Sequence, residues 1–169
     1  MQNAWLARAA NPQFARADVV QRINHAAASI RRDGGRVIFI RHADEEAPAG
    51  SPAWNIIPAL HVSAADAAVD KLACDAFAGT DLAHILAAHE AGTVYICGFA
   101  TEFCVDTTVR AAVSRALQVV VLGDAHTTSD RSHLDAQAII THHNWVWANM
   151  AVPAGSSLEV TTTTQAFPG

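Results

Sequence analysis

The sequence has little charge, few cysteines and no long apolar run. Charged residues make up only 16% of the 169 residues and hydrophobic residues 51%, which is more apolar surface than disordered chains carry. The formal net charge of −5 would repel a phosphate backbone, so a dedicated nucleic-acid-binding protein is not expected. This length predicts a single domain spanning residues 1–169, with its own core.

Targeting and metal-binding signals are also missing. No apolar run approaches the roughly 18 residues of a membrane span, and Met1–Leu6 lacks the basic and apolar regions of a signal peptide. We therefore expect a cytoplasmic protein without a membrane partner. The three cysteines form no CxxC pair, and the nine histidines form no HExxH or HxH motif. With no glycine-rich phosphate loop either, neither a metal nor a cofactor is predicted.

Helical and extended patterns alternate along the chain. Apolar residues recur at helical spacing over residues 17–32, and β-branched runs predict buried strands over 36–42, 93–99 and 118–125. Shorter strands are expected near 68–71 and 157–162. Further helices are expected over 81–90, with Thr80 as the N-cap, over 104–116 and over 134–148, and a tail from Phe167. Such alternation predicts an α/β fold with a parallel sheet, whose sites form at the carboxyl ends of the strands.

Cys104 follows the strand over 93–99 at a sharp turn. We expect it in the first turn of the next helix, where unpaired backbone N–H groups and the helix dipole favour a nucleophilic thiolate. The same N–H groups suit an oxyanion. Cysteine is also among the most buried residue types, so this position alone leaves a structural role open beside a nucleophilic one.

Lys71 lies in an apolar stretch between Val69 and Leu72, at the expected end of a short strand. A buried lysine is either a paired charge or a functional group, whereas a lysine on a packed stem keeps its head in water. Both interpretations stay open. Cys97, in mid-strand, is predicted to be a core residue, and Cys74 a structural one.

Several blocks, taken in order, resemble the isochorismatase-like (cysteine hydrolase) superfamily over nearly the whole sequence. The blocks are Met1-Gln2-Asn3-Ala4-Trp5, Val37–His42, Gly50–Trp54 with Pro58, and Lys71 followed by Asp75–Leu82. The most specific are Gly98-Phe99-Ala100-Thr101-Glu102-Phe103-Cys104-Val105 and Asp124-Ala125-His126-Thr127-Thr128.

This resemblance implies a three-layer α/β/α fold around a mostly parallel, six-stranded sheet. It also implies an Asp-Lys-Cys triad in which Cys104 is the nucleophile and Lys71 the lysine. The backbone N–H groups of Ala100 and Cys104 would form the oxyanion hole, beside a cis peptide bond between Phe99 and Ala100. The substrate contacts expected from it are Trp5, Trp54, Thr101 and Phe103.

The sequence departs from the family pattern at its start. The family's aspartate ends the first strand, immediately before the position of Met1, so neither the aspartate nor that central strand is present. A sheet without this strand would have two unpaired strand edges and a gap in its core. We therefore expect a natural chain with roughly 8–15 more residues upstream. A truncated paralogue acting as a binding protein is the alternative.

The predicted function is cysteine-dependent hydrolysis of a small amide, carbamoyl or ureido C–N bond through a thioester on Cys104. An isochorismatase-type vinyl ether hydrolase is an alternative. A metal-dependent nicotinamidase is not favoured, because His42 and Asp44 stand in the reverse order of the Asp-x-His cluster. Arg41 and His42 are expected either to contact a substrate carboxylate or to form an ordinary surface pair.

The expected partners are a small-molecule substrate and further copies of the chain. The resemblance implies a homo-oligomer, either a dimer or a tetramer. The apolar residues of 145–150 would supply either its interface or the packing of their own helix.

Overall fold

A computed structural model of the chain describes residues 1–6 and 11–168, with Trp5 and Leu6 described by their backbone only. The helices are α1 (Asn3–Leu6), α2 (Arg16–Arg32), α3 (Leu82–Ala88), α4 (Asp106–Val113), α5 (Ala136–Asn149) and α6 (Thr163–Ala166). The strands are β1 (Ile38–His42), β2 (Ala67–Lys71), β3 (Thr93–Phe99), β4 (Gln118–Thr127) and β5 (Ser157–Thr161). A π-helical turn, η1 (Thr101–Val105), leads from β3 into α4.

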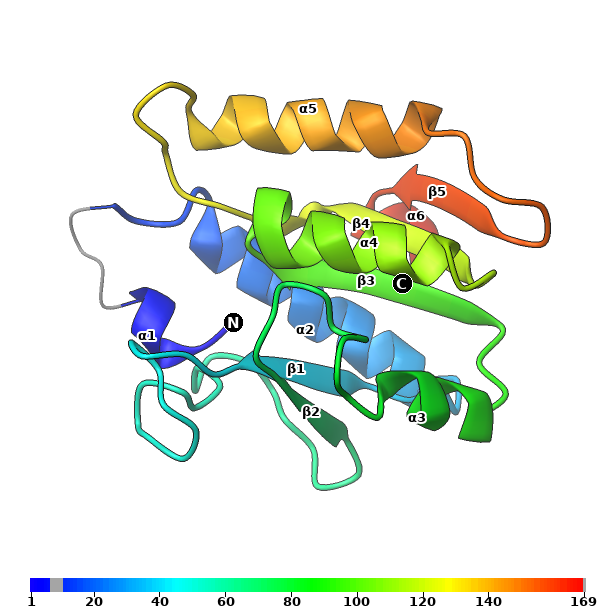
Figure 1. Cartoon of the computed structure of the whole chain (residues 1–169), viewed down its shortest axis with the longest axis horizontal. Helices are drawn as coiled ribbons and strands as arrows, with labels where there is room; N and C mark the ends of the chain where they lie inside the picture. Colours follow the sequence, from blue (N-terminus) through cyan, green and yellow to red (C-terminus); the bar gives the residue numbers. More distant parts are fainter. Residues whose placement is uncertain (7–10, 169) are drawn as a thin grey trace.

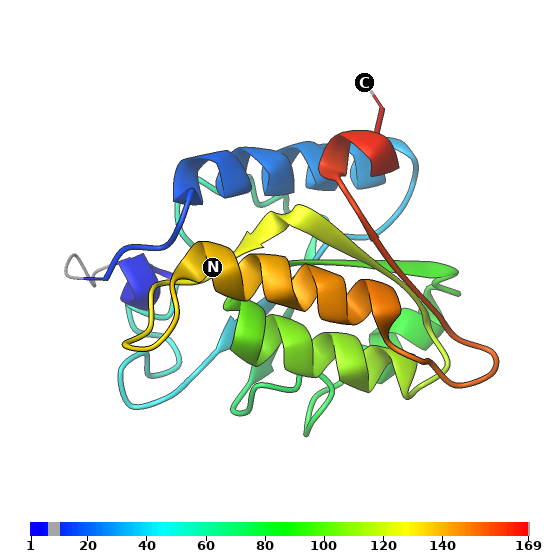
Figure 2. The same cartoon turned by 90° about the horizontal axis from the view of Figure 1, so that it is seen from above.

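The predicted α/β/α architecture is confirmed. Helices α2 and α6 lie on one side of β3 and β4, and helices α4 and α5 lie on the other (Figures 1 and 2). Successive side chains of β4 pack against the helices on opposite faces of the sheet, as expected for a strand buried on both faces. Val119 and Val121 pack in the cluster that includes α4 and Trp147, whereas Leu122 packs against α2.

The sheet is divided into two parts. Strands β1 and β2 pair in parallel, and β3, β4 and β5 form a separate parallel sheet. A cavity of about 980 Å³ extends between β1 and β3, and its walls come from both strands and from α2 and α3. Its apolar lining includes Ile30, Ile38, Ile40, Tyr95, Ile96 and Leu86. This cavity separates the β1–β2 pair from the sheet of β3, β4 and β5.

Two helix starts differ from the sequence-based expectation. The helix after β3 begins at Thr101 rather than Cys104, because the Ala100 carbonyl already accepts hydrogen bonds from the N–H groups of Phe103 and Val105 at 3.2 and 3.1 Å. The Phe99–Ala100 peptide is cis, as expected. The N-cap of α3 is Asp81 instead of Thr80.

Phe167, predicted to begin a tail, is instead packed against the rest of the protein. Phe167 is only 7% exposed and packs in the cluster beneath α2. Its carbonyl oxygen lies 3.0 Å from Nε2 of His25 on that helix. Helix α6 makes this possible, because its capping box at Thr162 turns the chain back onto α2 after β5.

Candidate active site

Three chain segments meet where the strands end. Strand β1 ends at His42, β2 ends at Lys71, and β3 leads through the cis peptide into the turn that carries Cys104. Because the carboxyl ends of parallel strands share one edge, residues far apart in sequence come together there. The Lys71 ammonium donates a hydrogen bond to Sγ of Cys104 at 3.1 Å. Both candidate catalytic residues therefore stand at one end of the cavity, which both of them line.

Lys71 is buried, with 4% of its surface exposed. Its ammonium also donates to the carbonyl oxygens of Ala73 at 2.6 Å and Cys74 at 3.2 Å. Of the two interpretations of this lysine, the one that keeps its head in water is therefore wrong. Lys71 is also the only lysine in the chain, a signal that by itself singles out this position.

The sequence offers His42 only as a possible substrate contact or a surface residue, and the structure places it beside Lys71. It is the register partner of Lys71 in the β1–β2 pair, and its Nδ1 lies 3.3 Å from the Lys71 ammonium. Its Nε2 lies 3.6 Å from Oδ2 of Asp44. Burial and the positive charge of Lys71 lower the pKa of His42, against a smaller raising effect of Asp44.

The buried side chain of Gln2 fixes the backbone around His42. Its amide donates to the carbonyl oxygens of His42 at 2.9 Å and Trp54 at 2.7 Å, and its Oε1 accepts from the His42 N–H at 2.8 Å. Gln2 is 3% exposed. The end of β1 and the loop after it are therefore held in place by one residue near the start of the chain.

The other two cysteines differ from Cys104. Cys97 lines the cavity wall on β3, and burial raises the pKa of its thiol to about 11. The pKa of Cys74 is also raised, first by burial and then by the neighbouring Cys104. Both shifts favour the neutral thiol, which is the unreactive form.

Of the residues expected to form the oxyanion hole and to bind substrate, some line the cavity and one is buried away from it. Ala100 and Phe103 line the cavity together with Cys104, and Phe103 is 50% exposed beneath the guanidinium of Arg131. Thr101 is fully buried, and its hydroxyl bonds Nδ1 of His126 at 2.9 Å. The side chain of Trp5 lies outside the described residues.

Arg41 and Trp54 form a separate pair. The Arg41 guanidinium stacks on the Trp54 ring at 3.7 Å from its centre and makes a bidentate ion pair with Asp70. Arg41 is thus held by neighbours within the protein. This arrangement favours a structural pair over the other expected role of Arg41, contact with a substrate carboxylate.

A comparison with protein families decides the relationship. The isochorismatase domain model matches residues 1–164. This chain belongs to the isochorismatase family. Streptothricin hydrolase of Streptomyces noursei is 30% identical over 136 residues, which are 77% of this chain and 48% of that protein. The isochorismatase family protein YwoC of Bacillus subtilis (strain 168), uncharacterized, is 38% identical over 96 residues, covering 53% of this chain and 51% of YwoC. The chain thus spans about half the length of the curated relatives it matches.

Solved structures in the family share the fold. The cysteine hydrolase from Pseudomonas syringae pv. phaseolicola 1448A superposes with a TM-score of 0.88 at 26% identity, covering 98% of this chain and 86% of that one. Among the residues described for this family member, no group of three His, Cys, Asp or Glu side chains is arranged to hold a metal ion. No helix in the described ranges is long and apolar enough to cross a bilayer.

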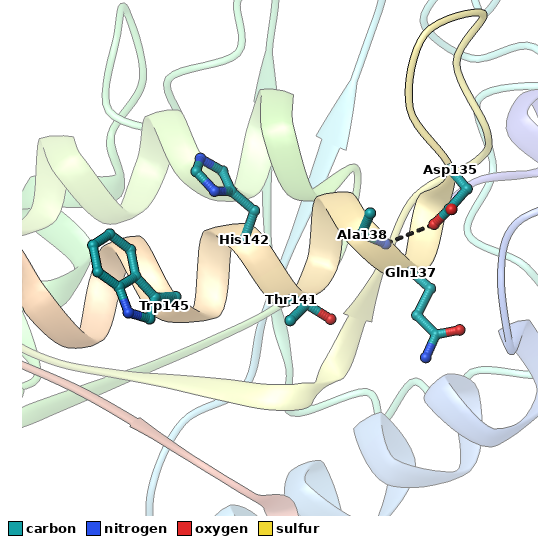
Figure 3. Close-up of a pocket in the computed structure, with 6 residues that line it drawn as sticks. All are labelled: Asp135, Gln137, Ala138, Thr141, His142 and Trp145. Carbon is teal, nitrogen blue, oxygen red and sulfur yellow. Dashed lines mark hydrogen bonds between the residues drawn. The ribbon is translucent and has the colours of Figure 1, made fainter.

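The apolar residues near the end of α5 divide between core and surface. Trp147 is buried at 1% exposed, whereas Trp145 is 65% exposed. Trp145 lies with His142, Thr141 and Gln137 along a shallow hollow on the outer side of α5 (Figure 3). Core packing therefore accounts for Trp147, and homo-oligomer formation through this family member's α5 stays a prediction.

Proposed function

We propose that this isochorismatase-family chain is a cysteine-dependent hydrolase of a C–N bond in a small amide, carbamoyl or ureido compound. The observation that carries the proposal is the 3.1 Å contact between the Lys71 ammonium and the Cys104 sulfur at the end of a cavity. An ammonium at this distance stabilises a thiolate. The similarity to streptothricin hydrolase supports a hydrolytic role.

The reaction takes place in two stages. The Cys104 thiolate attacks the carbonyl carbon, a C–S bond forms, and the carbonyl π electrons move to oxygen. Backbone N–H groups at Ala100 and Cys104 are the proposed donors to this oxyanion. The oxyanion collapses, the C–N bond breaks, and the amine leaves with the proton that Cys104 released when it became a thiolate. Water then cleaves the thioester, releasing the acid and restoring the thiol.

The proposal assigns Lys71 an electrostatic role. Its ammonium is fixed by the Ala73 and Cys74 carbonyl oxygens and directed at the sulfur. The side chain therefore needs no reorganisation as negative charge moves between the sulfur and the carbonyl oxygen, which is the condition under which a fixed charge contributes most. Phe103 and Arg131, which line the same cavity, are the proposed contacts for the part of the substrate that does not react.

The test is ammonia or amine release from a panel of small amides, carbamoyl compounds and ureides. Cys104→Ala is expected to abolish turnover, and Cys104→Ser to reduce it by at least about 10³-fold, because a hydroxyl without a strong base is a poor nucleophile. The matched control is Cys97→Ala, which changes the other cysteine of the cavity wall and should leave turnover within about twofold.

The same panel separates the alternatives. Turnover that survives Cys104→Ala would contradict the thiol mechanism. Release of pyruvate from isochorismate by both the parent chain and Cys104→Ala would favour vinyl ether hydrolysis instead. Binding of panel compounds without any turnover would favour a binding protein.

A further inference from the structure

A line of buried hydrogen bonds joins α5 to the turn that carries Cys104. The Thr101 hydroxyl lies 2.9 Å from Nδ1 of His126, and Nε2 of the same ring lies 2.9 Å from Oδ1 of Asn144. Thr101 is fully buried, and His126 is 1% exposed. The three side chains belong to η1, β4 and α5, so the line runs from a helix through the sheet to the segment of the proposed nucleophile.

The partners of Asn144 assign the direction of each bond in this line. Its Nδ2 donates to the Gly123 carbonyl oxygen at 2.9 Å, so its Oδ1 faces His126 and accepts from the N–H group at Nε2. Nδ1 of a neutral imidazole then has the lone pair, and the Thr101 hydroxyl donates to it. Burial lowers the pKa of His126, which favours this neutral ring. The Thr101 hydroxyl is therefore tied to one acceptor in one orientation.

The surroundings of the line hold the imidazole in place. A side chain at Gly123 would put its Cβ 3.1 Å from Oδ1 of Asn144 and 2.9 Å from Cγ1 of Val160, so glycine at this position lets α5 approach β4 closely. The Trp147 ring packs edge-on against His126, with 5.2 Å between the ring centres. In a buried, low-dielectric interior a lost hydrogen-bond partner costs more than in water, so these bonds hold His126 firmly.

We propose that His126, anchored by Asn144, is a positioning residue that holds the proposed oxyanion hole in place through Thr101. Because the oxyanion belongs to the proposed hydrolysis, this role rests on the proposed function. Thr101 directly follows Ala100 and lies three residues before Cys104, so its backbone connects the two N–H groups proposed as donors. Donors fixed in advance stabilise the developing charge without reorganisation, and a displacement of about 1 Å lowers a rate by about 10²-fold.

This role of Thr101 differs from the substrate contact that the family resemblance implies. The neighbouring Ala100 and Phe103 line the cavity, whereas Thr101 is buried behind them and its hydroxyl is bonded to His126. Thr101 therefore acts on the reaction through the backbone of the turn and not by touching the substrate.

Two reactions of Cys104 separate this role from a general loss of structure. Attack on p-nitrophenyl acetate creates an oxyanion, whereas alkylation by iodoacetamide displaces iodide from a saturated carbon and creates none. The measured quantity is the ratio of the acylation rate to the alkylation rate. Acylation is followed by the nitrophenolate release that Cys104→Ala removes, and alkylation by peptide mass mapping.

Thr101→Val removes the hydroxyl at nearly constant volume, and its ratio should be about 10–100-fold below that of the parent chain. Thr101→Ser keeps the hydroxyl and should stay within about threefold of the parent. The matched control is Thr163→Val. Thr163 is also buried, at 1% exposed, and its hydroxyl donates to Oδ1 of Asp124 at 2.7 Å. This control loses a buried hydrogen bond of the same kind away from the turn, so its ratio should match the parent even where its stability falls.

Further variants test the rest of the line. His126→Leu removes the acceptor of the Thr101 hydroxyl, and its ratio should fall as far as in Thr101→Val. The double variant should fall no further, because both changes break the same hydrogen bond. Asn144→Ala, at the far end of the line, should lower the ratio by a smaller factor, and it gives the same readout if a change at Thr101 or His126 prevents folding.

An unchanged ratio in Thr101→Val would overturn the proposal, as would effects of Thr101→Val and His126→Leu that multiply in the double variant. Where those variants do not fold, an unchanged ratio in Asn144→Ala has the same consequence. Nitrophenolate release that does not depend on Cys104 in the parent chain would overturn the proposed function, and this role with it. Release that depends on Cys104, with equal ratios in all variants, would remove the positioning role alone.

Discussion

The ammonium of Lys71 lies 3.1 Å from the sulfur of Cys104, although the two residues are 33 positions apart in sequence. The contact depends on two local facts: the buried end of β2 and the helical turn that follows β3. Nothing else in the described part of the chain offers a second lysine for this place, since Lys71 is the only one. Substitution of either Lys71 or Cys104 therefore tests the proposed chemistry directly.

Replacing Lys71 by Met keeps the length of the side chain and removes its charge. We expect the hydrolysis rate and the Cys104 alkylation rate at pH 7 both to fall by about 10²–10³-fold, the scale of one lost electrostatic donor. The carbonyl oxygens of Ala73 and Cys74 also lose their donor, so stability should fall by about 1–3 kcal/mol. Urea denaturation measures this loss separately. Equal alkylation rates in Lys71→Met and the parent chain would contradict the electrostatic role.

The three cysteines should react in a fixed order. Since burial raises the pKa of Cys97 to about 11, its thiolate fraction at pH 8 is about 100-fold below that of an ordinary cysteine. We expect iodoacetamide to modify Cys104 first, then Cys74, and Cys97 last in the native protein. Peptide mass mapping at timed intervals measures the order. Denaturation should abolish the differences, which serves as the control, and early modification of Cys97 would contradict the assignment.

The protein should lose stability in acid through the buried His126. Burial lowers the pKa of His126, whose Nδ1 accepts from Thr101 and whose Nε2 donates to Asn144, both at 2.9 Å. In the unfolded chain, His126 has its ordinary pKa near 6.5 and binds a proton below that pH, whereas in the folded protein it stays neutral to lower pH. The free energy of unfolding is therefore undiminished above pH 6.5 and falls as the pH is lowered below it. The slope is at most about 1.4 kcal/mol per pH unit for one such histidine.

Comparing the parent chain with His126→Gln checks this dependence. Urea denaturation at pH 7.5 and 5.5 should show a smaller difference between the two pH values in the variant, even if His126→Gln is less stable at both. Asn144→Asp is a second comparison, because a carboxylate beside the ring raises the pKa of His126 and weakens the acid effect. An undiminished pH dependence in both variants would show that His126 does not cause it.

A strand supplied to the cavity between β1 and β3 should stabilise the fold. We expect a chain extended before Met1 by an apolar segment ending in Ile-Asp to unfold at a temperature higher by on the order of 5 °C, since about 2 kcal/mol is gained from pairing and burial. An apolar fluorescent dye should bind the parent chain and be displaced in the extended one. A Gly-Ser extension of equal length is the control. An unaltered melting temperature with continued dye binding would contradict this use of the cavity.

Much of the architecture follows from local patterns. Continuous apolar runs mark β1, β3 and β4, and helical spacing marks α2 and α5, because each pattern is a property of neighbouring residues. The same patterns misplace the start of the helix after β3. The Ala100 carbonyl accepts from two N–H groups and sets that start, and a non-periodic backbone arrangement of this kind leaves no trace in hydrophobic spacing.

The sequence by itself determined the order of the elements, the family resemblance and the two candidate residues, Lys71 and Cys104. Only the tertiary structure decided that His42 stands beside Lys71, because this neighbourhood depends on the parallel register of β1 and β2. The same holds for the buried Phe167 and for the Thr101–His126 hydrogen bond, which join distant segments. The physical reason is that side-chain periodicity depends on the local backbone conformation. Burial and side-chain hydrogen bonds depend instead on which distant segments the fold brings together.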